Sequence, residues 1–194
     1  MRIGLRDLFI APITVADSGT ETYGKPQRLA KAIQADLAPQ SAEATLYADD
    51  AIDAIVKEFS GGNLTLGLND LTPEKQALIL GQTQDADGVV YASGGDEPPY
   101  FACAFRARRA DGTYRYMWLY KIKFAIPNEN HATKGSSITF QTPQIVGSFI
   151  KRPDGKWKAD WTGSPDDPVA LDWFKKVREP NTDNTNDPAD PLDP

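Results

Sequence analysis

Three aspartates at positions 49, 50 and 53 are the side chains whose types and spacing most directly suggest chemistry. They form a DDxxD pattern within ATLYADDAID, residues 44–53. Carboxylates one turn apart on a helix can hold Mg²⁺ against a diphosphate, but that chemistry needs a large all-helical cavity, a second acidic motif and basic residues. The surrounding sequence favours strands and has no second acidic cluster. We therefore expect Asp49, Asp50 and Asp53 to be solvated in a loop or short turn between two strands.

The remaining reactive side chains are one cysteine and one histidine. Cys103 lies in the apolar run YFACAF, where we expect a buried thiol, because reactive thiols need an electropositive, partly exposed setting. His131 lies in the loop-like NENHATKG. Single copies exclude an internal disulfide, a Cys-cluster metal site and a His-pair metal site. The glycine-rich FSGGN and ASGGDEPP lack the phosphate-loop patterns. We expect no catalytic site, no metal and no cofactor.

Length and charge limit the domain organisation and the partners. A chain of 194 residues with 40% hydrophobic residues suits one domain with an extension. We predict a single β domain over residues 1–178 and a disordered, acidic, Pro/Asn/Asp-rich tail over residues 179–194. The tail contains five acidic residues and no basic one, so the formal charge of −6 leaves −1 for the domain. A near-neutral domain is a poor partner for nucleic-acid phosphates.

Neither a membrane span nor a secretory signal is evident. No apolar run reaches the ~18 residues that a spanning helix needs. The N-terminal MRIGLRDLFIAPIT lacks the basic region, long apolar stretch and cleavage site of a signal peptide. We expect synthesis in the cytosol and no membrane partner.

Residues 100–124, YFACAFRARRADGTYRYMWLYKIKF, carry the clearest strand pattern. Asp111-Gly112 predicts a two-residue hairpin turn, because both central positions of the favoured turn have positive φ. Pairing Ala110 with Thr113 would place six apolar residues on one face: Phe101, Cys103, Phe105, Trp118, Tyr120 and Ile122. The basic residues would share the other face: Arg106, Arg108, Arg115, Lys121 and Lys123. That face is expected to be solvated, or else to meet acidic groups of a neighbouring molecule.

Residues 31–37 and 63–68 alternate between apolar and small polar side chains, which is typical of strands. The apolar positions, expected to cover a core, are Ile33, Ala35, Leu37, Leu64, Leu66 and Leu68. Further hairpins are predicted between residues 4–14 and 23–37, and around Pro153-Asp154-Gly155 between GSFIK and KWKADW, with Trp157 and Trp161 on one side.

Two helices are predicted from their terminal residues. Thr72 can cap one helix, with Pro73 in its first turn and Gly81 at its left-handed end. Asp167 can cap a second helix with an apolar stripe of Val169, Ala170, Trp173, Phe174 and Val177 that ends before Pro180. Together the patterns predict a mainly antiparallel β-sandwich or barrel with two short α-helices.

Several stretches, taken in order, resemble those of a known family. They are AEATLYADD (42–50), VKEF (56–59), LTLG (64–67), YRYMWLYKIKFAIPNENHATKG (114–135) and ITFQTP (138–143). The set is similar to the major tail proteins, or tail tube proteins, of long-tailed siphovirus-type phages and prophages of Gram-positive bacteria. The similarity runs over about residues 3–175, although no single stretch encodes chemistry.

The resemblance implies a tail-tube-like fold and a structural role in the virion tail. Subunits of that family form hexameric rings whose strands join in an inner β-barrel, and the rings stack into a tube for DNA delivery. The implied partners are copies of this chain and other tail proteins at the tube ends. Phage DNA would pass through without specific binding, because neutral or acidic polar groups give phosphates no counterion-release gain.

Two sets of residues are candidates for these roles. The apolar residues within the acidic stretch favour a contact between subunits or between rings. That predicted contact loop, within residues 44–55, contains Thr45, Leu46, Tyr47, Ala48, Asp49, Asp50, Ile52 and Asp53. The small polar faces of two strands are predicted to line the channel, and they contain Gln34, Asp36, Asn63 and Thr65.

Two alternatives remain open. Four tryptophans and seven tyrosines on a β scaffold would also fit a carbohydrate-binding β-sandwich module. A small hydrolase is the third interpretation, since acidic residues are abundant and only geometry identifies a working carboxylate pair.

Overall fold

The computed structural model describes residues 1–17, 19–48, 51–129, 133 and 142–180. The strands within these residues are β1 (Arg2–Val15), β2 (Glu21–Tyr23), β3 (Gln27–Arg28), β4 (Ala32–Ala48), β5 (Ala51–Leu68), β6 (Thr83–Gln84), β7 (Val90–Tyr91), β8 (Phe101–Arg109), β9 (Tyr114–Phe124), β10 (Gln144–Phe149) and β11 (Lys158–Gly163). The helices are α1 (Pro73–Leu80) and α2 (Pro168–Asp172). The prediction of a mainly antiparallel β fold with two short helices is confirmed.

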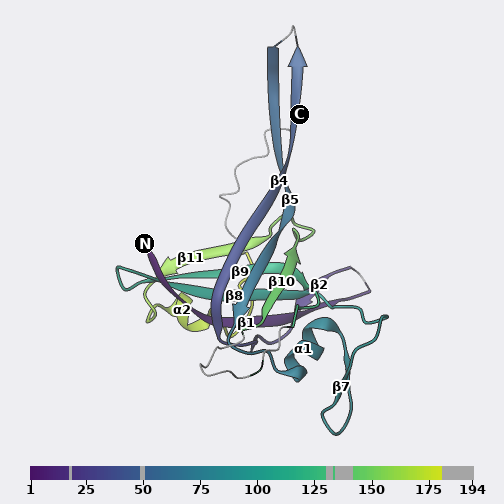
Figure 1. The fold of residues 1–194 in the computed structure, drawn as a ribbon. Helices are drawn as coiled ribbons and strands as arrows, with labels where there is room; N and C mark the ends of the chain where they lie inside the picture. Colours follow the sequence, from purple (N-terminus) through teal and green to yellow (C-terminus); the bar gives the residue numbers. More distant parts are fainter. Residues whose placement is uncertain (18, 49–50, 130–132, 134–141, 181–194) are drawn as a thin grey trace.

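One large antiparallel sheet organises the chain (Figure 1). Its strands follow the order β2-β1-β8-β9-β10-β5-β4, while β3 also pairs with β1, and β11 also pairs with β9. The sheet is so strongly twisted that β4 crosses over the strands at its other end and approaches β1. The two halves of the sheet therefore face each other across a core, an arrangement consistent with a β-sandwich.

The main core lies between these two halves. Leu64, Leu66 and Leu68 of β5 are fully buried there, as their alternation predicted. Strands β1, β8 and β9 supply the facing apolar side chains: Leu8, Ile10, Phe101, Cys103, Phe105, Met117, Leu119 and Ile122. Helix α1 adds Ile79 and Leu80. This core holds the root of β4 and β5 against the rest of the sheet.

A second, aromatic cluster covers the opposite face of β8 and β9. Strand β9 contributes Tyr114, Tyr116, Trp118 and Tyr120, and the C-terminal segment contributes Ala170, Trp173 and Val177. The indole N–H of Trp118 donates a hydrogen bond to the carbonyl oxygen of Trp173 (3.0 Å). Both faces of β8 and β9 are therefore buried, which explains why the sequences of these two strands are nearly continuous in apolar residues.

The hairpin between β8 and β9 differs from the prediction by one residue. The amide of Arg109 donates to the carbonyl oxygen of Thr113 (2.9 Å), and Gly112 has φ 85°. The turn therefore has three residues, with glycine in the left-handed position, instead of the two residues expected around Asp111-Gly112. The observed pairs are Phe105–Met117, Cys103–Leu119 and, beyond a bulge, Phe101–Ile122.

Because the register differs by one residue, part of β9 has its side chains on the opposite face of the sheet from the one predicted. Trp118 and Tyr120 lie in the aromatic cluster, on the other side of the sheet from Cys103 and Phe105. The prediction that all six apolar residues share one face is therefore wrong. The physical reason is the period of two along a strand, which turns a one-residue change of register into a change of side.

The turn expected around Gly155 is present, but the hairpin expected on either side of it is not. Gly155 has φ 79°, and its amide donates to the carbonyl oxygen of Arg152 (3.0 Å). Strands β10 and β11 do not pair with each other, because they lie one after the other along the same edge of β9. Trp157 packs against the main core and Trp161 against the aromatic cluster, so the prediction that they share a side is wrong.

The predicted helix caps and the N-terminal hairpin are confirmed in part. The hydroxyl of Thr72 accepts a hydrogen bond from the amide of Lys75 (3.4 Å), and Gly81 ends α1 with φ 70°. Asp167 caps α2, but this helix ends at Asp172, well before the predicted end. Strand β1 pairs with β2 and β3, whereas residues 32–37 of the predicted partner belong to β4.

Candidate assembly surfaces

Of the single cysteine and the single histidine, only the cysteine lies within the described residues. Cys103 is fully buried, and burial raises the pKa of its thiol to about 12. Within the described residues, no group of three or more His, Cys, Asp and Glu side chains could hold a metal ion. His131, Asp49 and Asp50 lie outside the described residues, and so do the residues of the predicted acidic tail after Pro180.

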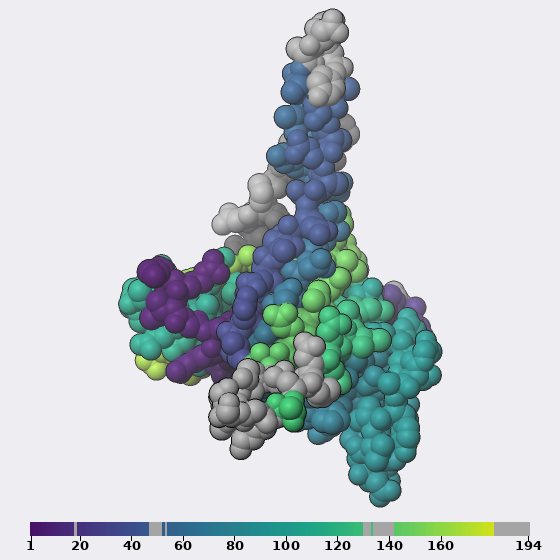
Figure 2. All heavy atoms as spheres, in the orientation of Figure 1, coloured from purple at the N-terminus to yellow at the C-terminus, as the bar shows by residue number. Residues whose placement is uncertain are grey.

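The main protruding feature is a two-stranded arm, defined here as residues 41–48 of β4 and 51–60 of β5. Figures 1 and 2 show it as a narrow column that stands away from the body. Cross-strand pairs run from Ser41–Phe59 to Ala48–Ala51, and Glu43 forms an ion pair with Lys57 (3.0 Å). The stretch 44–55 is therefore strand on both sides of residues 49–50, and not the loop that we expected. The high β-propensity of its Thr, Tyr, Ile and Val residues accounts for the strand.

The arm exposes large apolar side chains on both of its faces. Leu46, Ile52, Ile55 and Val56 are 58%, 57%, 52% and 62% exposed. In the observed register Thr45 lies opposite Ile55, whereas Ala44 lies opposite Val56 on the other face. A two-stranded ribbon is at best marginally stable alone in water, and both outer backbone edges of the described part of this one have no partner strand. Such a ribbon gains stability when another surface covers it.

The arm leaves the body where strand β10 ends. Phe149, the last residue of β10, is paired with Gly62 of β5. The ring of Phe59 stacks on Trp157 with 4.8 Å between the ring centroids, and Gly61 has φ 133°. Beyond this aromatic root, β5 pairs with β4 alone among the described strands. The body therefore anchors the arm firmly at one end.

The four residues predicted to line a channel share one solvent-facing side of β4 and β5. Asp36 is paired with Thr65, and Asn63 accepts a hydrogen bond from the hydroxyl of Ser148 on β10 (3.0 Å). The amide of Gln34 donates to the carboxylate of Asp36 (2.5 Å). Gln34, Asp36 and Asn63 are exposed and Thr65 is half-buried, so the structure joins them in one polar surface. That this surface lines a channel remains a prediction.

One apolar residue expected in the core is outside it. Ile33 is 57% exposed, although Ala35 and Leu37 pack against the main core as predicted. The register of β4 against β5 shifts between Ala32 and Gln34, and this irregularity turns the Ile33 side chain outwards.

The predicted single basic face of β8 and β9 is also wrong. Arg106 is paired with Tyr116, whereas Arg115 is paired with Ala107 and so projects to the other side of the sheet. Four of the five basic residues lie next to a carboxylate of this chain: Arg106 with Asp7, Arg115 with Asp160, Lys121 with Glu21 and Lys123 with Glu97. The same slip in register that moved Trp118 accounts for the difference.

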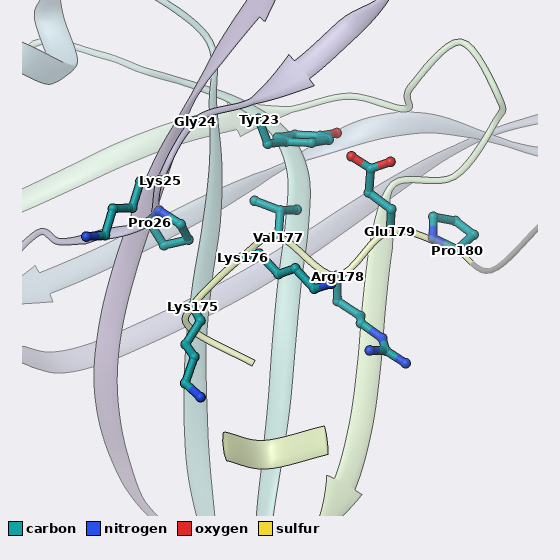
Figure 3. Close-up of a pocket in the computed structure, with 10 residues that line it drawn as sticks. All are labelled: Tyr23, Gly24, Lys25, Pro26, Lys175, Lys176, Val177, Arg178, Glu179 and Pro180. Atoms are coloured by element: carbon teal, nitrogen blue, oxygen red, sulfur yellow. The ribbon is translucent and has the colours of Figure 1, made fainter. Parts of the chain in front are cut away.

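An open groove lies between residues 23–26 and 175–180 (Figure 3). The ring of Tyr23 covers one side, and burial raises the pKa of its hydroxyl. The hydroxyl of Tyr120 donates to the carbonyl oxygen of Arg178 (2.7 Å). All ten lining residues are described, and they contain no cysteine, serine or histidine that could serve as a nucleophile or base. The lining of this groove therefore contains no Ser/His or Cys/His pair.

The aromatic residues give little support to a sugar-binding surface. All four tryptophans are described, and each is buried or half-buried. Tyr91 is the one exposed tyrosine among those whose side chains the structure describes, and its hydroxyl donates to Asp85. Carbohydrate modules stack sugars on exposed aromatic rings, so one tyrosine on a two-residue strand is a poor platform.

Comparison with known proteins adds no assignment. Neither a scan against protein-family models nor a search of curated proteins found a match to this chain. No helix among the described residues is long and apolar enough to cross a membrane.

Proposed function

We propose that this protein is a tail tube subunit of a long-tailed phage or prophage, which assembles with copies of itself into hexameric rings. The rings stack into a tube in the virion tail, and DNA passes through the tube on its way to the host. Other tail proteins would contact the tube at its ends. The chain acts by assembly and not by catalysis.

The observation that carries this proposal is the arm. Four large apolar side chains stay half-exposed on a ribbon that, among the described strands, pairs with the body only at its root. An isolated globular protein gains nothing from such a ribbon, because exposed apolar surface and free strand edges favour unwanted association. A subunit whose arm is covered by the next copy gains both burial and backbone pairing. The ordered resemblance of the sequence to tail tube proteins is what suggests this particular assembly.

The large sheet suits ring closure. Strand β4 forms one edge of the sheet, and no described strand pairs with its outer side. In a ring, each such edge can be joined to a different edge of the next copy, which is a heterologous contact that closes. The polar surface with Gln34, Asp36, Asn63 and Thr65 would then face the channel. It contains one carboxylate and no cation, so DNA phosphates gain no fixed counterion there.

Negative-stain electron microscopy of the concentrated protein, with its mass measured in solution, tests the proposal. We expect rings or hollow tubes that form without any added ligand and that become more abundant as the protein concentration rises. A monomer at every concentration, with tight binding to glycans, would reject the proposal in favour of the carbohydrate-binding alternative.

A further inference from the structure

Four exposed basic side chains border the groove between residues 23–26 and 175–180 (Figure 3). They are Lys25, from the segment after β2, and Lys175, Lys176 and Arg178, from the segment after α2. Glu179 is the one carboxylate among the ten lining residues, all of which are described. Four positive charges and one negative charge give the lining a formal charge of +3.

Most of this positive charge has no partner in the chain. Lys175 forms an ion pair with Asp172 (2.8 Å). Among the described residues, no carboxylate forms an ion pair with Lys25, Lys176 or Arg178. Three exposed cations therefore remain available to an acidic ligand at the rim of the groove.

A buried guanidinium behind Tyr23 adds to the positive charge. The Arg152 guanidinium carbon lies 5.5 Å from the ring centroid of Tyr23 and 5.0 Å from that of Tyr120. Asp154 lies 3.4 Å from the Nε atom of Arg152, but neither Nε nor Nη1 makes a hydrogen bond among the described residues. Cations on the rim and behind the wall of a concave site concentrate anionic groups there.

The chain itself supplies an acidic segment beside the groove. Residues 181–194 lie outside the described residues and follow directly from Pro180, which lines the groove. They contain no basic residue and four aspartates, which are Asp183, Asp187, Asp190 and Asp193. Each residue extends a chain by at most about 3.6 Å, so Asp183 can lie up to about 10 Å from Pro180 and the later aspartates farther away. The tether is long enough for the aspartates to turn back to the rim.

We infer that the groove is a binding site for an acidic peptide segment, and that its occupant is residues 181–194 of the same chain. Aspartates of this segment lie against Lys25, Lys176 and Arg178, where charges of opposite sign attract each other. A short tether gives the segment an effective concentration at the groove of about millimolar, so it displaces the same segment of another copy. One subunit contains both parts, and the contact does not depend on the proposed function.

Carbodiimide cross-linking of the full chain tests the inference, because this reagent joins an amine directly to a carboxylate that touches it. We expect links from Lys25 and Lys176 to the aspartates of residues 181–194, identified by mass spectrometry. They should be at least about fivefold more frequent than links from Lys57 and Lys156, which are exposed lysines outside the groove. Raising the salt concentration from about 0.05 M to about 0.5 M should remove most of this difference, since salt screens exposed charges.

A charge reversal that spares both reporting lysines is the matched test. Arg178→Glu should lower the yield of the links from Lys25 and Lys176 at least about threefold, because the carboxylates then meet a like charge. Arg6→Glu makes the same change in charge at an exposed arginine that does not line the groove, and should leave the yield unchanged. Thermal melting by circular dichroism should show that both variants are folded.

A mixture of isotope-labelled and unlabelled chains identifies which copy supplies the segment. Links confined to one isotopic form support the inference. Links that join labelled to unlabelled chains overturn the same-chain occupant in favour of a second copy. Equal link frequencies for all four lysines, or an unchanged yield in folded Arg178→Glu, overturn the groove as the binding site. None of these results bears on the proposed function, which is tested by the formation of rings and tubes.

Discussion

Replacing apolar residues of the arm should prevent assembly and leave the subunit folded. Ile55→Asp/Val56→Asp changes one residue on each face of the arm, far from both cores. Both side chains are already more than half exposed in the isolated chain, at 52% and 62%. The free energy of unfolding of the subunit should therefore change by less than about 1 kcal/mol.

The effect on assembly follows from the same exposure. Complete burial of an Ile or Val side chain stabilises by about 1.5–3 kcal/mol, so covering the exposed half of each is worth roughly 1 kcal/mol. An unpaired polar group that is buried instead costs about 1–3 kcal/mol. The two substitutions together should weaken each arm contact by at least about 4 kcal/mol. Since 1.4 kcal/mol is a factor of about ten, the concentration needed for assembly should rise more than about 100-fold.

Sedimentation over a range of protein concentrations, with negative-stain microscopy of the pellet, measures this shift. Val89→Asp/Leu171→Asp is the matched control, because these side chains are 49% and 58% exposed but lie outside the arm. The control should sediment like the wild type. If Ile55→Asp/Val56→Asp assembled at the wild-type concentration, or if the control lost assembly equally, the assignment of the arm as the interface would be refuted.

Two further predictions concern the body of the subunit. Gly62→Ala should lower the free energy of unfolding by about 1–3 kcal/mol, because the added Cβ would lie 2.6 Å from the carbonyl oxygen of Ala38 and closer still to the ring of Phe149. Gly94→Ala is the matched control, because a Cβ added at Gly94 meets no atom within 4 Å. Equal melting curves for the two variants would contradict the packing explanation. The Cys103 thiol, whose pKa burial raises to about 12, should resist alkylation at pH 8 until denaturant unfolds the chain, and rapid labelling of the native protein would show that this part of the core opens.

Local features of the sequence were reliable where short-range chemistry decides the structure. The cap at Thr72 and the stop at Gly81 were predicted because a side chain or a left-handed residue acts within one turn of the helix. The burial of Leu64, Leu66 and Leu68 followed from alternation, since a period of two separates the faces of any half-buried strand. These signals need no knowledge of distant partners.

The sequence predictions that proved wrong all concern which strands pair with each other or the register in which they pair. Around Gly112 the sequence is compatible with a two-residue or a three-residue turn, and the packing of Trp118 against Trp173 favours the latter by placing the indole in the aromatic cluster. Strands β10 and β11 both pair with β9, at successive parts of the same edge, and not with each other, which sequence proximity alone cannot reveal. The length of the arm was missed because its acidic residues suggested a loop, whereas cross-strand pairing continues to Ala48 and Ala51.

The sequence by itself determined the strand-rich character, the turn positions, the helix start sites and the burial expected for Cys103. Each of these depends on the backbone preference or polarity of a few neighbouring residues. Only the tertiary structure decided that the arm extends beyond the other described strands with apolar residues on both faces, and that Ile33 is exposed and not in the core. Alternation assigns a residue to a face of its strand, but the twist and pairing of the whole sheet decide whether that face meets the core, another copy or water.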